Sequence, residues 1–260
     1  MVEYFNIKNI SKNNVRGKYK MEISRRNWNL KKQLYGYVKR LLDIIFSLTG
    51  IILTGPLMII IAILIRLDSE GPVIFKQERT GKNGKIFKMW KFRTMVANNN
   101  VKDFSKADQH TKVGTFLRKT SLDELPQFFS ILLGNMSFIG PRPWIHEYYL
   151  NMNEEQRHRV DVTPGLTGLA QAKGRNSISI FEKIGYDLEY IDNYSLFEDI
   201  KIIFLTVKTV LTKEGADAGK STIQNELEDL KNQNSVSKIN TIKVEKEKTK
   251  DKFQMISEII

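Results

Sequence analysis

The stretch on which the fold depends is Arg118-Lys119-Thr120-Ser121-Leu122-Asp123-Glu124-Leu125-Pro126-Gln127. From there onward, apolar residues recur at three- and four-residue spacing, at Leu122, Leu125, Phe128, Phe129, Leu132 and Leu133. This periodicity predicts one amphipathic helix that begins near Ser121 and ends at Gly134-Asn135. Pro126 is tolerated because amide hydrogens in a first helical turn lack intrahelical partners. Two adjacent carboxylates, Asp123 and Glu124, are therefore expected at the beginning of a helix.

Two interpretations of these carboxylates are open. Ser121 and Glu124 have the spacing of a capping box, in which acids simply stabilise a helix N-terminus. The neighbouring cations favour phosphoryl chemistry instead, because Arg118 precedes the acids and Arg142 follows in the stiff segment Gly140-Pro141-Arg142-Pro143. In such chemistry a carboxylate attacks phosphorus or holds a divalent cation, while guanidinium groups neutralise the developing negative charge.

The composition limits the function classes. The chain of 260 residues carries a formal net charge of +12, so polyanions are the expected partners: nucleic acid, anionic lipid or phosphorylated substrates. It contains no Cys, which excludes disulfides, thiolate zinc sites and a cysteine nucleophile. The three histidines are widely spread, so a histidine metal cluster is not expected. The first forty residues lack an apolar core, so no cleavable signal peptide is expected.

An apolar run extends from Leu41 to Ile65, with Asp43 as its only charge. At about 1.5 Å per helical residue it is long enough to cross a bilayer. Basic residues flank it on both sides, Lys39-Arg40 before and Arg66 after. A spanning helix usually carries its cations mainly on the cytoplasmic side, so this symmetry argues against a simple crossing.

The middle of that run contains Thr54-Gly55-Pro56. Pro56 removes one helical hydrogen bond and clashes with the carbonyl of Ile52, which predicts a bend, and the Thr54 hydroxyl is a nearby partner for a freed carbonyl. We therefore expect a re-entrant helix that dips into one leaflet, bends at Pro56 and returns. A kinked spanning helix is the second interpretation and a buried core helix the third.

Pattern alone predicts several further elements. Short β-prone runs at 73–75 and 86–93, joined through residues 81–84, predict a hairpin within 71–95. Helices are expected over 113–119, 144–158, 179–191 and 197–211, and turns over the Gly-rich segment 162–171. The apolar stripe of 197–211 is interpreted as core, with the lipid interface as the alternative.

Three further cations are candidate phosphate ligands, namely Lys91, Arg93 and Arg175. Lys91 and Arg93 are two residues apart in a predicted strand and so share one face, for which a solvated surface is the alternative. The basic N-terminal region is expected to be a solvated arm or a tether to anionic lipid, at about 1 kcal/mol per basic residue near the membrane. From about residue 223 the chain is rich in Lys, Glu and Asn, which favours disorder or loose helix.

Taken together, these motifs resemble one family, the bacterial sugar transferases or monotopic phosphoglycosyl transferases. The resemblance covers about residues 36–213, in order. It rests on Lys39-Arg40-Leu41-Leu42-Asp43, the Pro56-interrupted run, Gly71-Pro72-Val73-Ile74-Phe75-Lys76-Gln77-Glu78-Arg79, Lys91-Phe92-Arg93-Thr94-Met95, Ser121 to Gln127, Gly134 to Pro143, Pro164-Gly165-Leu166-Thr167-Gly168 and Gly174-Arg175-Asn176. The N-terminal arm and the tail after 213 lie outside it, as does the multi-span membrane region of larger members.

The resemblance implies an activity. Members of this family transfer a sugar 1-phosphate from a nucleotide diphosphate sugar to undecaprenyl phosphate, release the nucleoside monophosphate and so begin a cell-surface glycan. By that likeness Asp123 is the nucleophile that forms a phosphosugar-aspartyl enzyme. Glu124 helps Asp123 to hold Mg²⁺ and assists deprotonation, while Arg118 and Arg142 grip phosphates.

The expected fold class is α+β: a mostly helical monotopic membrane protein with a Pro-kinked re-entrant helix, a small β-hairpin and amphipathic interface helices. Its expected parts are a basic arm (1–38), the re-entrant helix (39–66) hinged at Thr54, Gly55 and Pro56, a catalytic domain (67–213) and a flexible charged tail (214–260).

The expected location is the cytoplasmic face of the bacterial cell membrane. The expected partners are a UDP-sugar, undecaprenyl phosphate and anionic lipid, with homo-oligomers and downstream glycosyltransferases as further ones. Nucleic acid is not expected, because no recognised nucleic-acid-binding motif is present. A lipid phosphatase and a non-catalytic basic anchoring or polyanion-binding module are the alternative functions.

Overall fold

The computed structural model describes residues 7–96, 109–174, 177–212 and 223–232. Its elements follow the chain as α1 (Ile7–Asp68), β1 (Ile74–Thr80), β2 (Ile86–Phe92), α2 (Lys112–Thr120), α3 (Gln127–Leu132), β3 (Ser137–Ile139), α4 (His146–Leu150), α5 (Glu154–Arg157), β4 (Gly165–Thr167), α6 (Leu169–Lys173), α7 (Ile180–Asp192) and α8 (Leu196–Thr212). Short 3-10 turns lie at Lys82–Gly84, Leu122–Glu124 and His158–Val160, and residues 223–232 form one more helix. The chain is therefore a mostly helical α+β protein, which confirms the expected fold class at that level.

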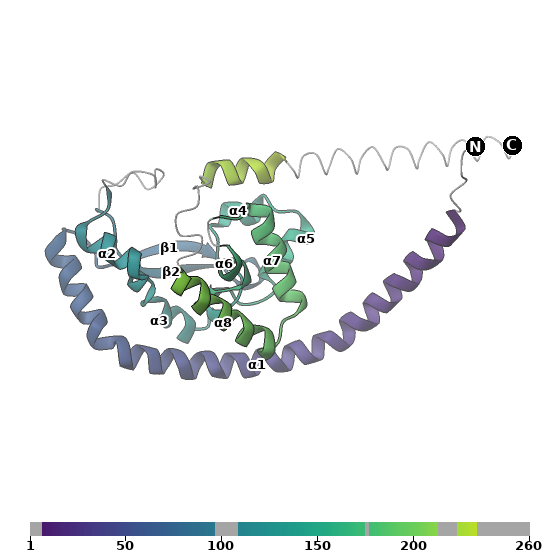
Figure 1. The fold of residues 1–260 in the computed structure, drawn as a ribbon, viewed down its shortest axis with the longest axis horizontal. Helices are drawn as coiled ribbons and strands as arrows, with labels where there is room; N and C mark the ends of the chain where they lie inside the picture. The colour runs from purple at the N-terminus through teal and green to yellow at the C-terminus, as the bar shows by residue number, and fades with distance from the viewer. Residues whose placement is uncertain (1–6, 97–108, 175–176, 213–222, 233–260) are drawn as a thin grey trace.

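Helix α1 curves beneath the rest of the molecule (Figure 1). Among the described residues, only its segment Leu30–Asp68 is long and apolar enough to cross a membrane. The helix is continuous through Pro56, and the Thr54 hydroxyl donates to the Gly50 carbonyl at 2.7 Å. The length and apolarity of this helix indicate membrane association. The re-entrant bend is not shown and stays a prediction.

Three polar residues of α1 join the helix to the rest of the fold. Arg40 donates to the carbonyls of Ile131 and Leu132 at 2.6 and 2.7 Å, where it closes the end of α3. Asp43 accepts hydrogen bonds from the Ser137 hydroxyl (3.0 Å) and the Phe138 amide (3.1 Å) at the beginning of β3. Lys39 forms an ion pair with Asp199 of α8.

The close approach of α1 requires a glycine halfway along the apolar run. A Cβ atom at Gly50 would lie 2.9 Å from the ring of Phe128 in α3. The region expected as a solvated arm is helical from Ile7 onward, and its Tyr35 donates to Asp199 at 2.5 Å. Helix α1 therefore packs against the rest of the fold, and it also contains the segment that is apolar enough to associate with a membrane.

The predicted hairpin is confirmed. Strands β1 and β2 pair antiparallel, with Phe75 opposite Lys91 and Gln77 opposite Met89. The turn between them uses positive φ at Asn83 (56°) and Gly84 (76°), as a tight connection requires.

The prediction of a single helix that begins near Ser121 is wrong for its first part, because a 3-10 turn at Leu122–Glu124 precedes α3. Ser121 has a φ of 58° and is the left-handed C-cap of α2, with its amide donating to the carbonyl of Arg118. Its side chain caps nothing in the following 3-10 turn, so the predicted capping box is also wrong. Glu124 instead turns toward Lys91 and Arg142. The predicted end is confirmed, because Gly134 has a φ of 86° directly after the C-cap of α3.

Two further predictions need correction between residues 144 and 171. The expected helix over 144–158 is broken into α4 and α5, because Asn153 begins a new helix through a capping box with Gln156. The segment expected to form only turns contains β4 and α6. Strand β4 pairs parallel with β3, and a Cβ at Gly165 would lie 2.1 Å from the Gly140 amide nitrogen. Gly140 and Gly165 therefore allow the backbones of the two segments to approach closely.

The two helices expected near the C-terminal end are confirmed as α7 and α8. Helix α7 begins with a capping box between Ser179 and Glu182. The stripe of α8 is not core. It is exposed at Phe197 (78%), Ile200 (43%), Ile203 (48%), Phe204 (72%), Val207 (53%) and Leu211 (77%). Since α8 lies on the same side of the molecule as α1 in Figure 1, this exposure favours the lipid-interface alternative.

Candidate active site

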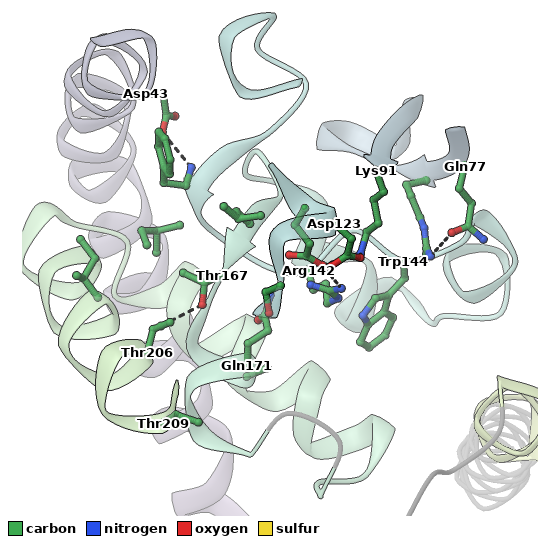
Figure 2. Close-up of a pocket in the computed structure, with 18 of the residues that line it drawn as sticks. Asp43, Gln77, Lys91, Asp123, Arg142, Trp144, Thr167, Gln171, Thr206 and Thr209 are labelled. Atoms are coloured by element: carbon green, nitrogen blue, oxygen red, sulfur yellow. Dashed lines mark hydrogen bonds and ion pairs between the residues drawn. The ribbon is translucent and has the colours of Figure 1, made fainter. Parts of the chain in front are cut away.

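A cavity of about 1520 Å³ opens between the hairpin, α1, α7 and α8, and the acidic pair lies in its wall. Its charged lining contains Arg79, Lys91, Arg93, Arg118, Asp123, Glu124 and Arg142. Figure 2 shows the side chains of Lys91, Asp123 and Arg142 converging in this cavity. Most of the residues that the sequence singled out are thus brought together by elements distant in the chain.

The local fold explains why the acids face the cavity. The 3-10 turn at Leu122–Glu124 is short, and the apolar Leu122 and Leu125 pack against the core formed by α1, β2 and α2. That packing directs Asp123 and Glu124 away from the core. Their side chains are 13% and 21% exposed, so they are shielded from bulk water while they line the cavity.

Glu124 is the centre of an ion-pair network. Its Oε1 accepts from Lys91 Nζ at 2.6 Å and from Arg142 Nη2 at 3.2 Å. Lys91 Nζ also lies 3.9 Å from Asp123 Oδ2. Because both partners of Glu124 use Oε1, Oε2 is the oxygen that a further cation could take.

The two neighbouring carboxylates have pKa values shifted in opposite directions. Burial raises the pKa of Asp123, against the opposing charge of Lys91. Burial alone would also raise the pKa of Glu124, but Arg142 and Lys91 hold it at about 2. Two titratable groups separated in this way are typical of a catalytic pair with divided roles.

The remaining predicted cations lie in different surroundings. Arg118 lines the cavity beside the acids, and its Nη1 lies 3.2 Å from His110 Nε2. Arg93 lines the same cavity, but it is buried and its Nη2 donates to the carbonyl (2.6 Å) and hydroxyl (2.9 Å) of Ser69. Arg175 lies outside the described residues. The phosphate-binding roles of all three stay predictions.

Sequence reasoning missed two polar side chains of β1. Gln77 and Arg79 line the cavity on the hairpin face that also carries Lys91, and Arg79 Nη2 donates to Gln77 Oε1 at 2.5 Å. Burial and the nearby charge of Arg142 lower the pKa of Arg79 to about 10. The signal was available, because alternate residues of a strand share one face once the register of the hairpin is fixed.

A third missed residue is Gln171 of α6. It lines the cavity, and Figure 2 shows it on the same side of the site as Arg142. Both polar atoms of its carboxamide are buried without a partner among the described residues. No pattern in the sequence distinguishes this Gln, because its position depends on the parallel pairing of β3 with β4.

The cavity has two chemically different ends. Toward α1 and α8 its lining carries the apolar side chains of Leu42, Phe46, Ile200, Ile203 and Val207, together with the paired charges of Lys39, Asp43 and Asp199. Toward α4 and α7 it is polar and aromatic, with Gln77, Trp144, Lys183 and Asp187. The acidic pair lies between these ends, so the site can present one charged centre to both an apolar and a polar ligand.

The donor set fits Mg²⁺ with substrate oxygens completing the coordination. Within the described part of the chain, no group of three or more His, Asp or Glu side chains could hold a metal alone. Mg²⁺ is commonly held by only one or two carboxylates together with substrate phosphates and water. Asp123 and the Oε2 atom of Glu124 supply that number of hard oxygen ligands.

Comparison with known proteins gives a family. The profile described as "Bacterial sugar transferase" matches residues 34–213. A UDP-glucose:undecaprenyl-phosphate glucose-1-phosphate transferase of Klebsiella pneumoniae is 48% identical over 181 residues, which are 65% of this chain and 39% of that protein. The galactosyl transferase CpsE of Streptococcus agalactiae is 43% identical over 194 residues, 68% of this chain and 43% of the relative.

A shorter relative is covered over most of its length. The uncharacterized sugar transferase EpsL of Bacillus subtilis is 42% identical over 180 residues, 68% of this chain and 89% of that protein. The chain therefore spans less than half of the two longer relatives and nearly all of this one.

Proposed function

The chain belongs to the bacterial sugar transferase family, and we propose that it transfers a sugar 1-phosphate from a UDP-sugar to undecaprenyl phosphate, with release of UMP, for polysaccharide biosynthesis. The observation that carries this proposal is the pair Asp123–Glu124 beside Lys91 and Arg142 in one cavity. That cavity has an apolar end for a lipid and a polar end for a nucleotide sugar. The activities for which the relatives are named supply the two substrates by analogy.

The proposed chemistry takes two steps. A carboxylate oxygen of Asp123 attacks the phosphorus attached to the sugar, and the bond to the UMP oxygen breaks, which leaves a phosphosugar-aspartyl ester. A phosphate oxygen of the acceptor then attacks the same phosphorus and Asp123 departs as the leaving group. A covalent intermediate divides one difficult transfer into two easier ones.

Glu124 is proposed to act through its charge. With a pKa of about 2, Glu124 remains ionised at neutral pH and is a weak base. It is therefore better suited to holding cations than to the expected assistance in deprotonation. It orients Lys91 and Arg142, whose charges face the substrate phosphates.

Mg²⁺ is the proposed cofactor, held by Asp123 and Glu124 Oε2. When bound, it would supply Lewis-acid charge to the transferred phosphoryl group. Among the described residues that line the cavity, seven are cationic (Lys39, Arg79, Lys91, Arg93, Arg118, Arg142 and Lys183) and five are anionic (Asp43, Asp123, Glu124, Asp187 and Asp199). This surplus of positive charge supports an anionic substrate with or without the metal.

Helix α1 is proposed to enter and leave the bilayer on the same face, with Pro56 as its hinge. The support is that one domain contacts α1 before, within and after the apolar run: at Lys39, at Gly50 and at Asp68. A helix that crossed the bilayer could touch such a domain only at one end. By this proposal the protein lies on the cytoplasmic face of the bacterial cell membrane, with basic residues near anionic lipid.

The topology has a direct test. Single cysteines in place of the exposed Lys31 and Lys85 lie before and after the apolar run. Both are expected to react with an impermeant maleimide only when the cytoplasmic side is opened. Labelling of the Lys31→Cys variant from outside intact cells would contradict the re-entrant helix and favour a kinked spanning helix.

The activity is tested with a panel of UDP-glucose, UDP-galactose and UDP-N-acetylgalactosamine, each with undecaprenyl phosphate. We expect release of UMP and transfer of sugar label into lipid with at least one donor. Release of inorganic phosphate from lipid would identify a phosphatase, and no turnover with any donor would favour a non-catalytic anchor. Homo-oligomers and downstream glycosyltransferases are proposed further partners, to be sought by crosslinking in membranes.

A further inference from the structure

Residues 223–232 lie beyond the family-matching residues 34–213, yet they are packed onto the catalytic domain. The sequence suggested a flexible tail here. Instead, Leu227 (6% exposed) and Leu230 (fully buried) join Tyr148 of α4 and Ile180 and Ile184 of α7 in one apolar cluster. Figure 1 shows this helix in yellow-green beside α4. Burial of two leucines at helical spacing gives the segment a fixed docking face.

A polar residue fixes the same helix at a second point. Glu226 Oε2 accepts from the Tyr148 hydroxyl at 2.6 Å, and its Oε1 accepts from Lys183 Nζ at 2.7 Å. The Lys183 and Glu226 side chains are only 18% and 13% exposed. Charge-assisted bonds in such a shielded place are stronger and more directional than those at an open surface.

The docked helix contributes to the catalytic cavity. Ile223 at its beginning and Lys183, which its Glu226 holds, both line the cavity. Trp144 lines the cavity as well and packs in the same cluster as Ile223. The helix therefore forms part of the polar end of the cavity, opposite the apolar end at α1 and α8.

The position of this end identifies the ligand it faces. The membrane-associated helices α1 and α8 lie at the bottom of Figure 1, whereas α4 and residues 223–232 lie at the top. A lipid phosphate must reach Asp123 from the apolar end, so the water-soluble nucleotide sugar is left with the polar end. Trp144 offers an aromatic ring at this end, with the guanidinium of Arg159 at 3.7 Å from the ring centroid, and such a ring suits a ligand that carries rings.

We propose that residues 223–232 form the wall of the donor end of the cavity and determine how tightly the nucleotide sugar binds. This inference rests on the proposed function, because it needs a donor and an acceptor with separate ends. It assigns a substrate-binding role to a segment outside the family match, with Glu226 as the positioning residue of Lys183.

The test separates the two substrates in the full-length chain. Leu230→Asp places a charge in the buried docking face and should raise the KM for the UDP-sugar at least about fivefold, the factor that corresponds to about 1 kcal/mol. The KM for undecaprenyl phosphate should stay within about twofold. Glu226→Gln keeps an acceptor for Tyr148 but loses the ion pair with Lys183, and should raise the donor KM by a smaller factor.

Glu228→Gln is the matched control, because it removes the same charge from an exposed position of the same helix. It should leave both KM values unchanged. Equal rises of both KM values in Leu230→Asp, or a donor KM that does not change in either variant, would overturn the proposal. A thermal unfolding curve identifies a variant that fails to fold, and then Glu226→Gln against Glu228→Gln decides alone.

The proposed function and this inference fail in distinguishable ways. If the unaltered protein released no UMP with any donor, the proposed function would be at fault. If it released UMP normally and the donor KM did not change in the Glu226 and Leu230 variants, only the proposed role of residues 223–232 would be refuted. Binding of UMP alone, followed by hydrogen exchange over 223–232, gives a readout independent of turnover, and protection of this helix is expected.

Discussion

Two of the described clusters that hold a carboxylate against a lysine differ in their surroundings. In the first, Glu124 is paired with Lys91 and Arg142 in the wall of an open cavity. In the second, Asp199 of α8 is paired with Lys39 of α1; both residues also line the cavity, but both side chains are less than 10% exposed. Tyr190 also donates to Asp199 at 2.7 Å. We call these the cavity cluster and the docking cluster.

The difference between the clusters teaches how to separate a functional ion pair from a structural one. In the docking cluster the Asp199 carboxylate is bonded to one cation and two tyrosine hydroxyls, so its negative charge is neutralised by Lys39 and its oxygens have partners within the protein. In the cavity cluster Glu124 is shared by two cations, and Asp123 remains only loosely paired at 3.9 Å from Lys91. A loosely paired carboxylate in a cavity is suited to an incoming ligand, whereas a balanced buried pair fixes two elements together.

The largest expected effect is the loss of the nucleophile from the cavity cluster. Asp123→Asn should lower turnover about 10⁴-fold or more, because the amide has no charge with which to attack phosphorus. Mass spectrometry after incubation with donor alone should find a phosphosugar adduct on the unaltered protein and none on the variant. Asp161→Asn, at an exposed surface pair, is the control and should retain full activity. Substantial turnover by Asp123→Asn would refute the covalent scheme.

The second effect concerns the charge that organises the same cluster. Glu124→Gln should lower kcat/KM about 10²-fold, or about 3 kcal/mol, in line with the loss of one preorganised electrostatic group. It should also weaken the dependence of the rate on Mg²⁺, measured by titration after EDTA treatment. An unaltered protein that works equally well in EDTA would show that the metal assignment is wrong.

The third prediction concerns stability and not activity. Lys39→Met leaves Asp199 buried without its cation and should lower the free energy of unfolding in detergent by about 3 kcal/mol. Lys91→Met in the open cavity cluster should cost much less stability. Thermal unfolding of both variants measures the contrast. Equal destabilisation would mean that the two clusters do not differ as their surroundings indicate.

The smallest predicted effect is a shift of a pH profile. Asp123 must be ionised to attack, so activity is lost as the pH falls through its pKa, which burial raises above the ordinary value of 3.8. Lys91 opposes that rise, so Lys91→Met should move the acidic limb of kcat/KM to higher pH, by less than about one unit. Lys88→Met, on the exposed face of the same strand, should leave the limb unchanged. A shift to lower pH would contradict the placement of Lys91.

Local sequence signals predicted the parts of this fold that depend on neighbours in the chain. The hairpin turn at 81–84, the capping box of α7 and the stop at Gly134 were all predictable, because each is determined within a few residues. The motif Asp123-Glu124 was recognisable as a candidate site for the same reason.

Features that depend on distant partners were missed. The helix after Ser121 is interrupted because Glu124 bonds to Lys91 of β2 and not to its own backbone, which periodicity does not reveal. The strand β4 exists only through its parallel partner β3, and with it comes the position of Gln171. Helix 223–232 was assigned to a polar tail, because only Leu227 and Leu230 carry the information that it docks.

The bonds from Arg40 and Asp43 have a consequence for the biogenesis of the protein. They close α3 and the beginning of β3, and Arg142 follows shortly after the end of β3. Helix α1 leaves the ribosome before either of them, and chains generally fold from their N-terminal part as they are synthesised. The helix can thus reach the lipid surface first and serve there as the template on which the domain folds. The order of synthesis then couples delivery to the membrane with completion of the candidate site.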